Sequence, residues 1–185
     1  AQKAELSASI NRRDNASWEA ALKIWQWAEP GYQETRSSAL LAKILADAGF
    51  RITQGVADIP TAFTATYGQG QPVIGILGEY DALPGLSQQA VPYREKKAGN
   101  VYGQGCGHHL FGVASASAAI AIAEQIKAGQ LSGTVRFYGC PAEEGGSAKV
   151  FLVRAGLFKD CNAVLHWHPS SRNAAGDRSS LARNA

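Results

Sequence analysis

The 185-residue sequence has no methionine, only three cysteines and few charged residues, which make up 18% of the chain. Cys106, Cys140 and Cys161 are odd in number and lack the spacing of a zinc finger or of a Cys-x-x-Cys redox pair. We therefore expect free cysteines without a disulfide. A chain of this length buries roughly 70% of its unfolded surface and needs no such links to fold. The composition predicts one globular domain, in which a bound metal would serve function.

Long apolar runs and basic clusters are also missing. The longest apolar stretch, residues 113–126, is interrupted by Ser115, Ser117 and Glu124. Because it is shorter than the roughly 20 residues of a membrane span, we predict a buried helix. The net charge is only +3, and the one basic cluster, residues 94–97, is short. We therefore expect neither a membrane nor a nucleic acid as a partner.

The signatures of three common enzyme classes are absent. The sequence contains no Gly-x-Ser-x-Gly nucleophile elbow and no Walker-type Gly-Lys-Ser. Gly103 and Gly105 begin a dinucleotide-binding pattern, but His108 stands where its third glycine is required. These absences disfavour α/β-hydrolase serine enzymes, P-loop nucleotide hydrolases and dinucleotide-dependent enzymes.

Helical and extended periodicities alternate along the chain. The run Val-Ile-Gly-Ile-Leu at 73–77 has no polar alternation, which is typical of a strand covered on both faces. Residues 82–105 show no periodicity, and an irregular connection of this length usually borders a functional site. The order of elements predicts an α/β fold of three layers, with a mostly parallel central sheet and helices on both faces. We predict helices over 17–29, 35–48, 110–128 and 147–155, and strands over 50–56, 62–67, 72–78, 134–138 and 163–167.

Polar side chains gather where three of the predicted strands end. Because ligands of such sheets bind outside the carboxyl ends of the strands, we expect these side chains to share one site. They comprise two acidic residues after the strand 72–78, two after the strand 134–138 and two histidines at the end of the last strand, namely Glu79, Asp81, Glu143, Glu144, His166 and His168.

All four histidines lie in the segments 106–109 and 166–168. A single buried Cys or His is usually a packed core residue. Thiolate, imidazole and carboxylate groups that converge, however, suit Zn²⁺, Mn²⁺, Co²⁺ or Ni²⁺. In extended or turning backbone, side-chain direction repeats every two residues, so Cys106 and His108 point to the same side. The second segment repeats this spacing, and the pattern predicts a divalent-metal site.

The pair Glu143-Glu144 stands in the sequence Cys-Pro-Ala-Glu-Glu-Gly-Gly. Pro141 and the two glycines predict a tight loop that allows the backbone to approach a ligand closely. Adjacent side chains in non-helical backbone point in different directions, so one carboxylate can bind metal while the other carries a proton. Metal-assisted hydrolysis needs this division of roles, and a solvated acidic turn is the alternative.

Four motifs, in order and spacing, resemble the amidohydrolase branch of the aminoacylase and carboxypeptidase metallopeptidases, at 78–84, 105–109, 141–146 and 166–169. The p-aminobenzoyl-glutamate hydrolase group of this branch is similar at further segments, 80–83, 85–89 and 137–141. The resemblance implies a zinc-peptidase-like catalytic domain with two divalent metal ions, Zn²⁺ or Mn²⁺. The implied reaction is cleavage of the amide bond of N-acyl or N-aroyl amino acids such as p-aminobenzoyl-glutamate.

The resemblance implies four metal ligands in this chain. Cys106 would bridge the two metals as a thiolate, and His108, Glu144 and His168 would be further ligands. Cys106 precedes the predicted helix 110–128, whose N-terminal dipole favours a thiolate. Protons compete with the metal for these groups, so we expect metal binding to strengthen as the pH rises.

Two further carboxylates take catalytic roles by the same resemblance. Glu143 would be the general base, which takes a proton from water and passes it to the leaving amine. Asp81 would orient a metal-bound residue. The resemblance gives no role to Glu79, and we treat His109 and His166 as groups that line the site.

In this family a smaller lid and dimerisation domain follows the region matched here. We expect a truncated protein, with the N-terminal part of the catalytic metallohydrolase domain over 1–171 and a linker toward the lid domain over 172–185. The full-length protein would be a homodimer, and the alternative for this chain is an inactive folded fragment or binding module without turnover. The start Ala-Gln-Lys, without Met, predicts a periplasmic or otherwise exported protein, with a cytoplasmic one as the alternative.

Overall fold

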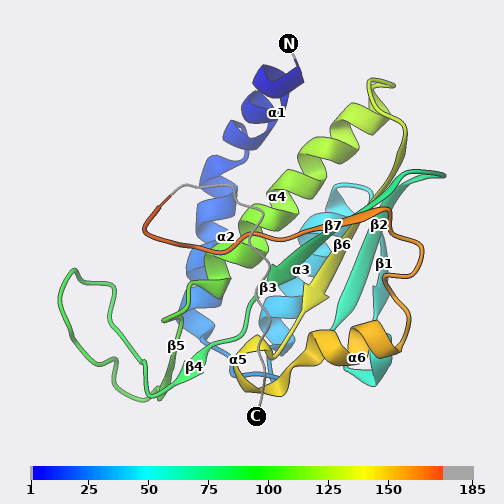
Figure 1. Ribbon diagram of the computed structural model, residues 1–185. Coiled ribbons are helices and arrows are strands. Elements are labelled where there is room, and N and C mark those ends of the chain that lie inside the picture. The colour runs from blue at the N-terminus through cyan, green and yellow to red at the C-terminus, as the bar shows by residue number, and fades with distance from the viewer. Residues whose placement is uncertain (1, 173–185) are drawn as a thin grey trace.

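A five-stranded sheet lies at the centre of the structure, a computed structural model that describes residues 2–172 (Figure 1). The strands are β1 (Arg51–Gln54), β2 (Phe63–Gln69), β3 (Val73–Glu79), β6 (Gly133–Cys140) and β7 (Ala163–Leu165). Their order in the sheet is β1-β2-β6-β3-β7, with β2 antiparallel to both of its neighbours and β3 parallel to β6 and β7. Four of the five strands therefore run in one direction, which confirms the mostly parallel sheet.

Three helices cover one face of the sheet, namely α2 (Asp14–Trp27), α3 (Thr35–Asp47) and α4 (His108–Lys127). Leu41 and Leu45 of α3 belong to the same buried cluster as Phe63 of β2 and Phe137 of β6. Burial of each such side chain contributes about 1.5–3 kcal/mol. The helix α1 (Gln2–Asn11) extends this layer and contacts α4.

The helix α4 is the central element of that layer. It is long and apolar enough to cross a membrane by length and composition, but more than half of it is buried inside the fold. It contacts β3 and β6 on one side and α1, α2 and α3 on the other. These contacts explain its apolar sequence as that of a core helix, as predicted.

The opposite face of the sheet carries a smaller layer. The helix α6 (Ala148–Arg154) and the short 3₁₀ helix η1 (Val56–Asp58) contact each other there. Leu152 of α6 and Tyr138 of β6 lie in a second buried cluster. Side chains alternate between the faces of a strand, and Tyr138 faces this cluster whereas its neighbour Phe137 faces the first. Helices on both faces confirm the three-layer architecture.

Some boundaries differ from those predicted. The first predicted helix, 17–29, begins earlier as α2, and α1 was not predicted because Leu6 and Ile10 alone give it little apolar periodicity. The connection 82–105 contains two short antiparallel strands, β4 (Leu83–Pro84) and β5 (Tyr102–Gly103). Of the predicted linker over 172–185, the part after Arg172 lies outside the described residues.

Candidate metal centre

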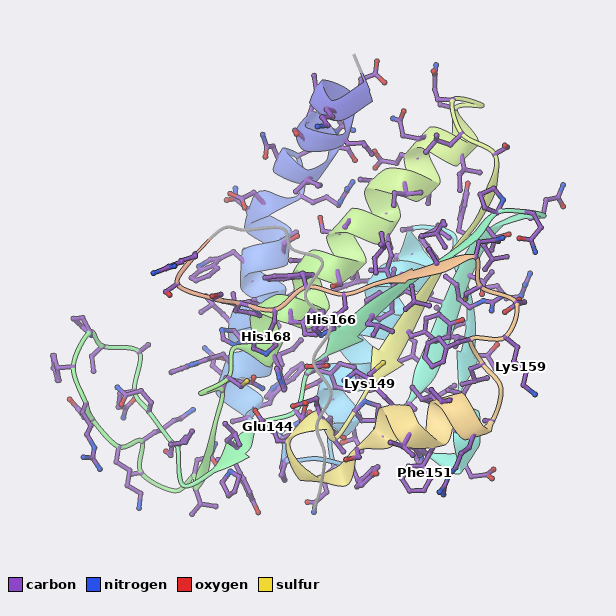
Figure 2. All side chains as sticks on the ribbon, in the orientation of Figure 1. Glu144, Lys149, Phe151, Lys159, His166 and His168 are labelled. Atoms are coloured by element: carbon purple, nitrogen blue, oxygen red, sulfur yellow. The ribbon has the colours of Figure 1, made fainter. Side chains whose placement is uncertain are left out.

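The candidate site lies where β3 and β6 end and α4 begins. Glu79, the last residue of β3, pairs with the last residue of β6, so the segments that follow the two strands leave the sheet side by side. Figure 2 shows the side chains of Glu144, Lys149, His166 and His168 around this edge. The structure thus brings together the strand ends that were predicted to share a site.

Two glycines allow α4 to reach this edge. A Cβ at Gly112 would clash with the backbone carbonyl of Glu79, so only glycine permits this approach of helix and strand. Gly107, with a φ of 84°, turns the chain into the helix immediately before His108. The expectation of extended backbone at His108 is therefore wrong, because His108 begins the helix. The left-handed turn at Gly107, rather than a two-residue repeat, places His108 near Cys106.

Asp81 holds two parts of the site at once. Its Oδ1 lies 2.7 Å from Nδ1 of the fully buried His108, and its Oδ2 accepts a hydrogen bond from the backbone N–H of Glu144 at 2.9 Å. A carboxylate accepts the proton on Nδ1, so Nε2 is the His108 nitrogen that faces the site. Burial alone would lower the pKa of His108, but the carboxylates of Asp81 and Glu79 raise it to about 10.

Three buried polar atoms converge at Nε2 of His108. Oε2 of Glu79 lies 3.0 Å from it, and Oε1 of Glu144 lies 3.9 Å from it. None of the three atoms has a hydrogen-bond partner of acceptable geometry. Leaving a buried polar atom unpaired costs about 1–3 kcal/mol, whereas a divalent cation would satisfy all three. These residues therefore fit a metal ion.

A second group of potential ligands shares His108 with the first. Sγ of Cys106 lies 3.3 Å from Nε2 of His168. The potential ligand atoms of Cys106, His108 and His168 all lie within 4.8 Å of one another, as do those of Glu79, His108 and Glu143. A thiolate and an imidazole on one Zn²⁺ stand about 3.1–3.6 Å apart, so the separation of Cys106 and His168 also fits a metal.

The acid strength of Cys106 differs from the expectation of a thiolate favoured by the helix terminus. Burial, followed by the carboxylates of Glu144 and Glu143, raises the pKa of the Cys106 thiol to about 12. The negative charges of the site thus outweigh the dipole of α4. A thiolate at Cys106 requires a positive charge beside it, which a divalent cation supplies.

The two glutamates lie in a helical turn, α5 (Glu143–Gly146), and not in the non-helical loop predicted from the sequence. They still differ in environment. The Glu143 side chain is 44% exposed, and its Oε2 lies 3.9 Å from Nε2 of His108, whereas the Glu144 side chain is 21% exposed and has a buried, unpaired oxygen. Burial, rather than backbone direction, separates the two carboxylates.

A buried acid that was not predicted as a site residue anchors this turn. Oε1 of Glu34 accepts a hydrogen bond from the backbone N–H of Ala142 at 2.7 Å, directly before Glu143. Ala142 has a φ of 51°, an unfavourable value for a residue with a Cβ. Burial raises the pKa of Glu34 to about 7. The hydroxyl of Tyr32 donates to the carbonyl of Gly146 at 2.5 Å, so both ends of the turn are held.

The structure also places the two histidines that were expected only to line the site. His166 directs Nε2 to within 3.9 Å of Glu79 Oε1 and packs its ring edge-on against Phe111, with centroids 5.0 Å apart. His109 belongs to neither group of potential ligands, and burial lowers its pKa to about 4. Cys106, Cys140 and Cys161 are free, as expected.

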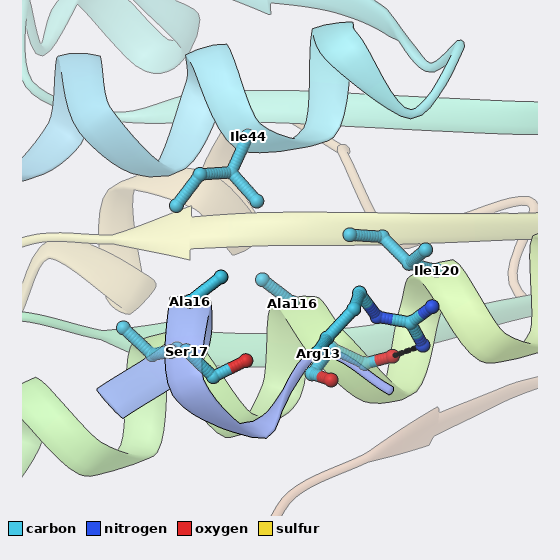
Figure 3. Close-up of a pocket in the computed structure, with 8 residues that line it drawn as sticks. Arg13, Ala16, Ser17, Ile44, Ala116 and Ile120 are labelled. Carbon is cyan, nitrogen blue, oxygen red and sulfur yellow. Dashed lines mark hydrogen bonds between the residues drawn. The ribbon is translucent and has the colours of Figure 1, made fainter. Parts of the chain in front are cut away.

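Two hollows differ in their relation to this site. One has a volume of about 410 Å³ and opens beside Glu144, with Tyr32, Pro84 and Tyr102 in its walls. The other has a volume of about 90 Å³ and lies between α2, α3 and α4, where Arg13 donates to the backbone carbonyl of Ser117 (Figure 3). The second hollow contains none of the potential ligands and is a packing gap between helices.

The sequence from 75 to 179 matches the pattern of Peptidase family M20/M25/M40. The chain belongs to this family. One of the two kinds of subunit of p-aminobenzoyl-glutamate hydrolase from Escherichia coli K12, a curated relative, is 51% identical over 152 residues, which cover 80% of this chain and 31% of that protein. The chain spans about a third of the length of the curated relatives it matches.

Solved structures show the same M20 fold. A putative aminohydrolase from methicillin-resistant Staphylococcus aureus superposes with a TM-score of 0.77 at 18% identity, over 89% of this chain and 41% of that one. A dinuclear metal-binding M20 peptidase from Bacillus subtilis superposes with a TM-score of 0.73 at 23% identity, over 89% of this chain and 44% of that one. The resemblance to metallopeptidases and the fold that it implied are confirmed.

Proposed function

We propose that this chain supplies part of the catalytic domain of a metal-dependent amidohydrolase that acts on N-acyl or N-aroyl amino acids. The observation that carries the proposal is the convergence of buried, unpaired donor atoms from Glu79, His108 and Glu144 beside an exposed carboxylate, Glu143. The 51% identity to a subunit of p-aminobenzoyl-glutamate hydrolase makes p-aminobenzoyl-glutamate the first substrate to test.

Cys106, His108, Glu144 and His168 would hold two divalent cations, for which Zn²⁺ and Mn²⁺ are the first candidates. Such ions polarise an amide carbonyl and lower the pKa of bound water. Asp81 fixes the ring of His108 and the backbone of Glu144, so both ligands start from defined positions. An orienting group of this kind is worth about 10–100-fold in metal affinity.

Glu143 is the proposed proton carrier. Its carboxylate lies at the border between the buried ligands and solvent, where a water molecule and the leaving amine can both reach it. Glu34 acts on this group indirectly, because it holds the N–H of the residue that precedes Glu143. The hollow of about 410 Å³ beside Glu144 gives room for part of a substrate, with two tyrosines in its walls.

A comparison of the two glutamates tests these roles in the protein that contains this chain. We expect Glu143→Gln to retain metal and to lose at least about 100-fold in kcat for p-aminobenzoyl-glutamate, as for a lost general base. Glu144→Gln should instead lose bound metal in elemental analysis. Glu19→Gln, which changes an exposed carboxylate of α2, serves as the control. Equal metal loss in the first two variants would refute the division of roles.

A folded module without turnover is the second candidate, because the chain spans about a third of its relatives. We propose that 1–171 belongs to the catalytic domain, that 172–185 leads to a lid and dimerisation domain, and that the whole protein is an exported homodimer. A version extended through the rest of the reading frame should then show activity and dimer mass that the 185 residues lack. Full activity in the 185 residues alone would contradict this division.

A further inference from the structure

Glu79 is the buried carboxylate that the proposed roles leave unused. Its side chain is almost completely buried at the end of β3, and Nζ of Lys149 donates to its Oε1. A buried charge requires pairing, and Lys149 satisfies one carboxylate oxygen. The other oxygen, Oε2, has no hydrogen-bond partner and points toward the site. A purely structural ion pair would not explain this free oxygen.

The free oxygen has the spacing of a metal ligand. It lies 3.0 Å from Nε2 of His108, and the two atoms are not aligned as a hydrogen bond. A carboxylate oxygen and an imidazole nitrogen that share one divalent metal, each about 2.1 Å from it, stand about 2.9–3.4 Å apart. The clustered ligand atoms of Glu79, His108 and Glu143 are distinct from the group of Cys106 and His168, although both groups include His108.

Lys149 comes from a different element than the ligands. It lies at the start of α6, just after the turn that carries Glu143 and Glu144, and Figure 2 shows it directed toward the site. Its ion pair with Glu79 ties α6 to the end of β3. Because Lys149 contacts Oε1, the rotation of the carboxylate is fixed with Oε2 toward His108.

We propose that Glu79 is an additional carboxylate ligand of the metal centre, shared with His108, and that Lys149 is the positioning residue that holds it in place. This inference rests on the proposed function only in that the site binds divalent cations. It assigns a role to two residues that the sequence did not connect.

Cobalt binding separates a ligand from a structural ion pair. We would titrate Co²⁺ into the metal-free protein that contains this chain and record the visible spectrum, the affinity and the number of ions bound. Glu79→Gln should weaken at least one bound ion by roughly 10-fold or more and change the ligand-field bands. The band from a thiolate of Cys106 should persist. Lys149→Met should give a smaller loss, and Lys159→Met, which removes an exposed lysine beyond α6, should give none.

Glu79→Asp covers the case in which Glu79→Gln fails to fold. It keeps the charge but shortens the side chain by one methylene, so Co²⁺ affinity should fall while the metal-free protein stays folded. Unchanged affinity and spectrum in the Glu79 variants, with a lower metal-free melting temperature, would overturn the inference and leave an ion pair of purely structural role. Failure of the unsubstituted protein to bind Co²⁺ would overturn the proposed function as well.

Discussion

Replacement of Glu34 by Gln should change how the stability of the protein depends on pH. Burial raises the pKa of Glu34 from an ordinary 4.5 to about 7, and Asp81 adds to this effect. Below about pH 4.5 the carboxyl is protonated in both folded and unfolded chains, and the native state has its full stability. As the pH rises toward 7, the unfolded chain loses the proton first, so the folded state becomes less stable.

The size of this loss follows from the pKa change. A rise from 4.5 to about 7 corresponds to about 3 kcal/mol of unfolding free energy, lost between about pH 4.5 and pH 7. Gln does not titrate, and its amide oxygen can still accept from the N–H of Ala142. Glu34→Gln should therefore match the unsubstituted protein at low pH and exceed it by up to about 3 kcal/mol at pH 8.

Urea unfolding of metal-free protein at several pH values measures this difference, and a chelator removes any stabilisation by bound metal. Glu29→Gln is a matched control of opposite sign. Burial alone would raise the pKa of Glu29, but hydrogen bonds from Ser37 and Arg36 lower it. Its stabilisation is present above its unfolded pKa and is lost as the pH falls. A pH-independent gap between Glu34→Gln and the unsubstituted protein would refute the reasoning.

Four further outcomes are expected. Cys106→Ser should abolish the thiolate-to-cobalt absorption band and weaken metal binding, and a retained band would show that another sulfur binds. Gly107→Ala places a Cβ at a φ of 84° and 3.2 Å from Pro169, so thermal unfolding should show a loss of about 1 kcal/mol. Asp81→Asn should lower Zn²⁺ affinity by about 10–100-fold in calorimetry, and an unchanged affinity would exclude its orienting role. Zn²⁺ binding should strengthen from about pH 6 to about pH 9, because protons on Cys106 and His108, whose pKa values are about 12 and 10, compete with the metal; flat affinity would contradict this competition.

The sequence could predict which strand ends meet, because parallel strands bring their carboxyl ends to one edge. Glu79, Glu143 and His166 follow three such strands, and the structure places them together. The local backbone was less predictable. The turn that carries Glu143 is helical because contacts from residues 32 and 34 hold it, and those contacts come from a segment more than 100 residues earlier.

The roles of Lys149 and Glu34 could not be predicted for the same reason. Lys149 begins a short helix, and nothing in its neighbourhood along the chain indicates a partner at the end of β3. Glu34 precedes a predicted helix, where an acidic residue usually has a local capping role. The high pKa of the Cys106 thiol likewise depends on carboxylates that approach through space, not along the sequence.

Asp81 has a consequence for how this site can change in evolution. One carboxylate holds an imidazole from α4 and a backbone amide from α5, so the positions of two proposed ligands are correlated. A substitution that moves the end of β3 displaces both together, and effects at His108 and Glu144 should not be additive. Adaptation to a metal with a different preferred geometry is less constrained at Cys106 and His168, which Asp81 does not contact.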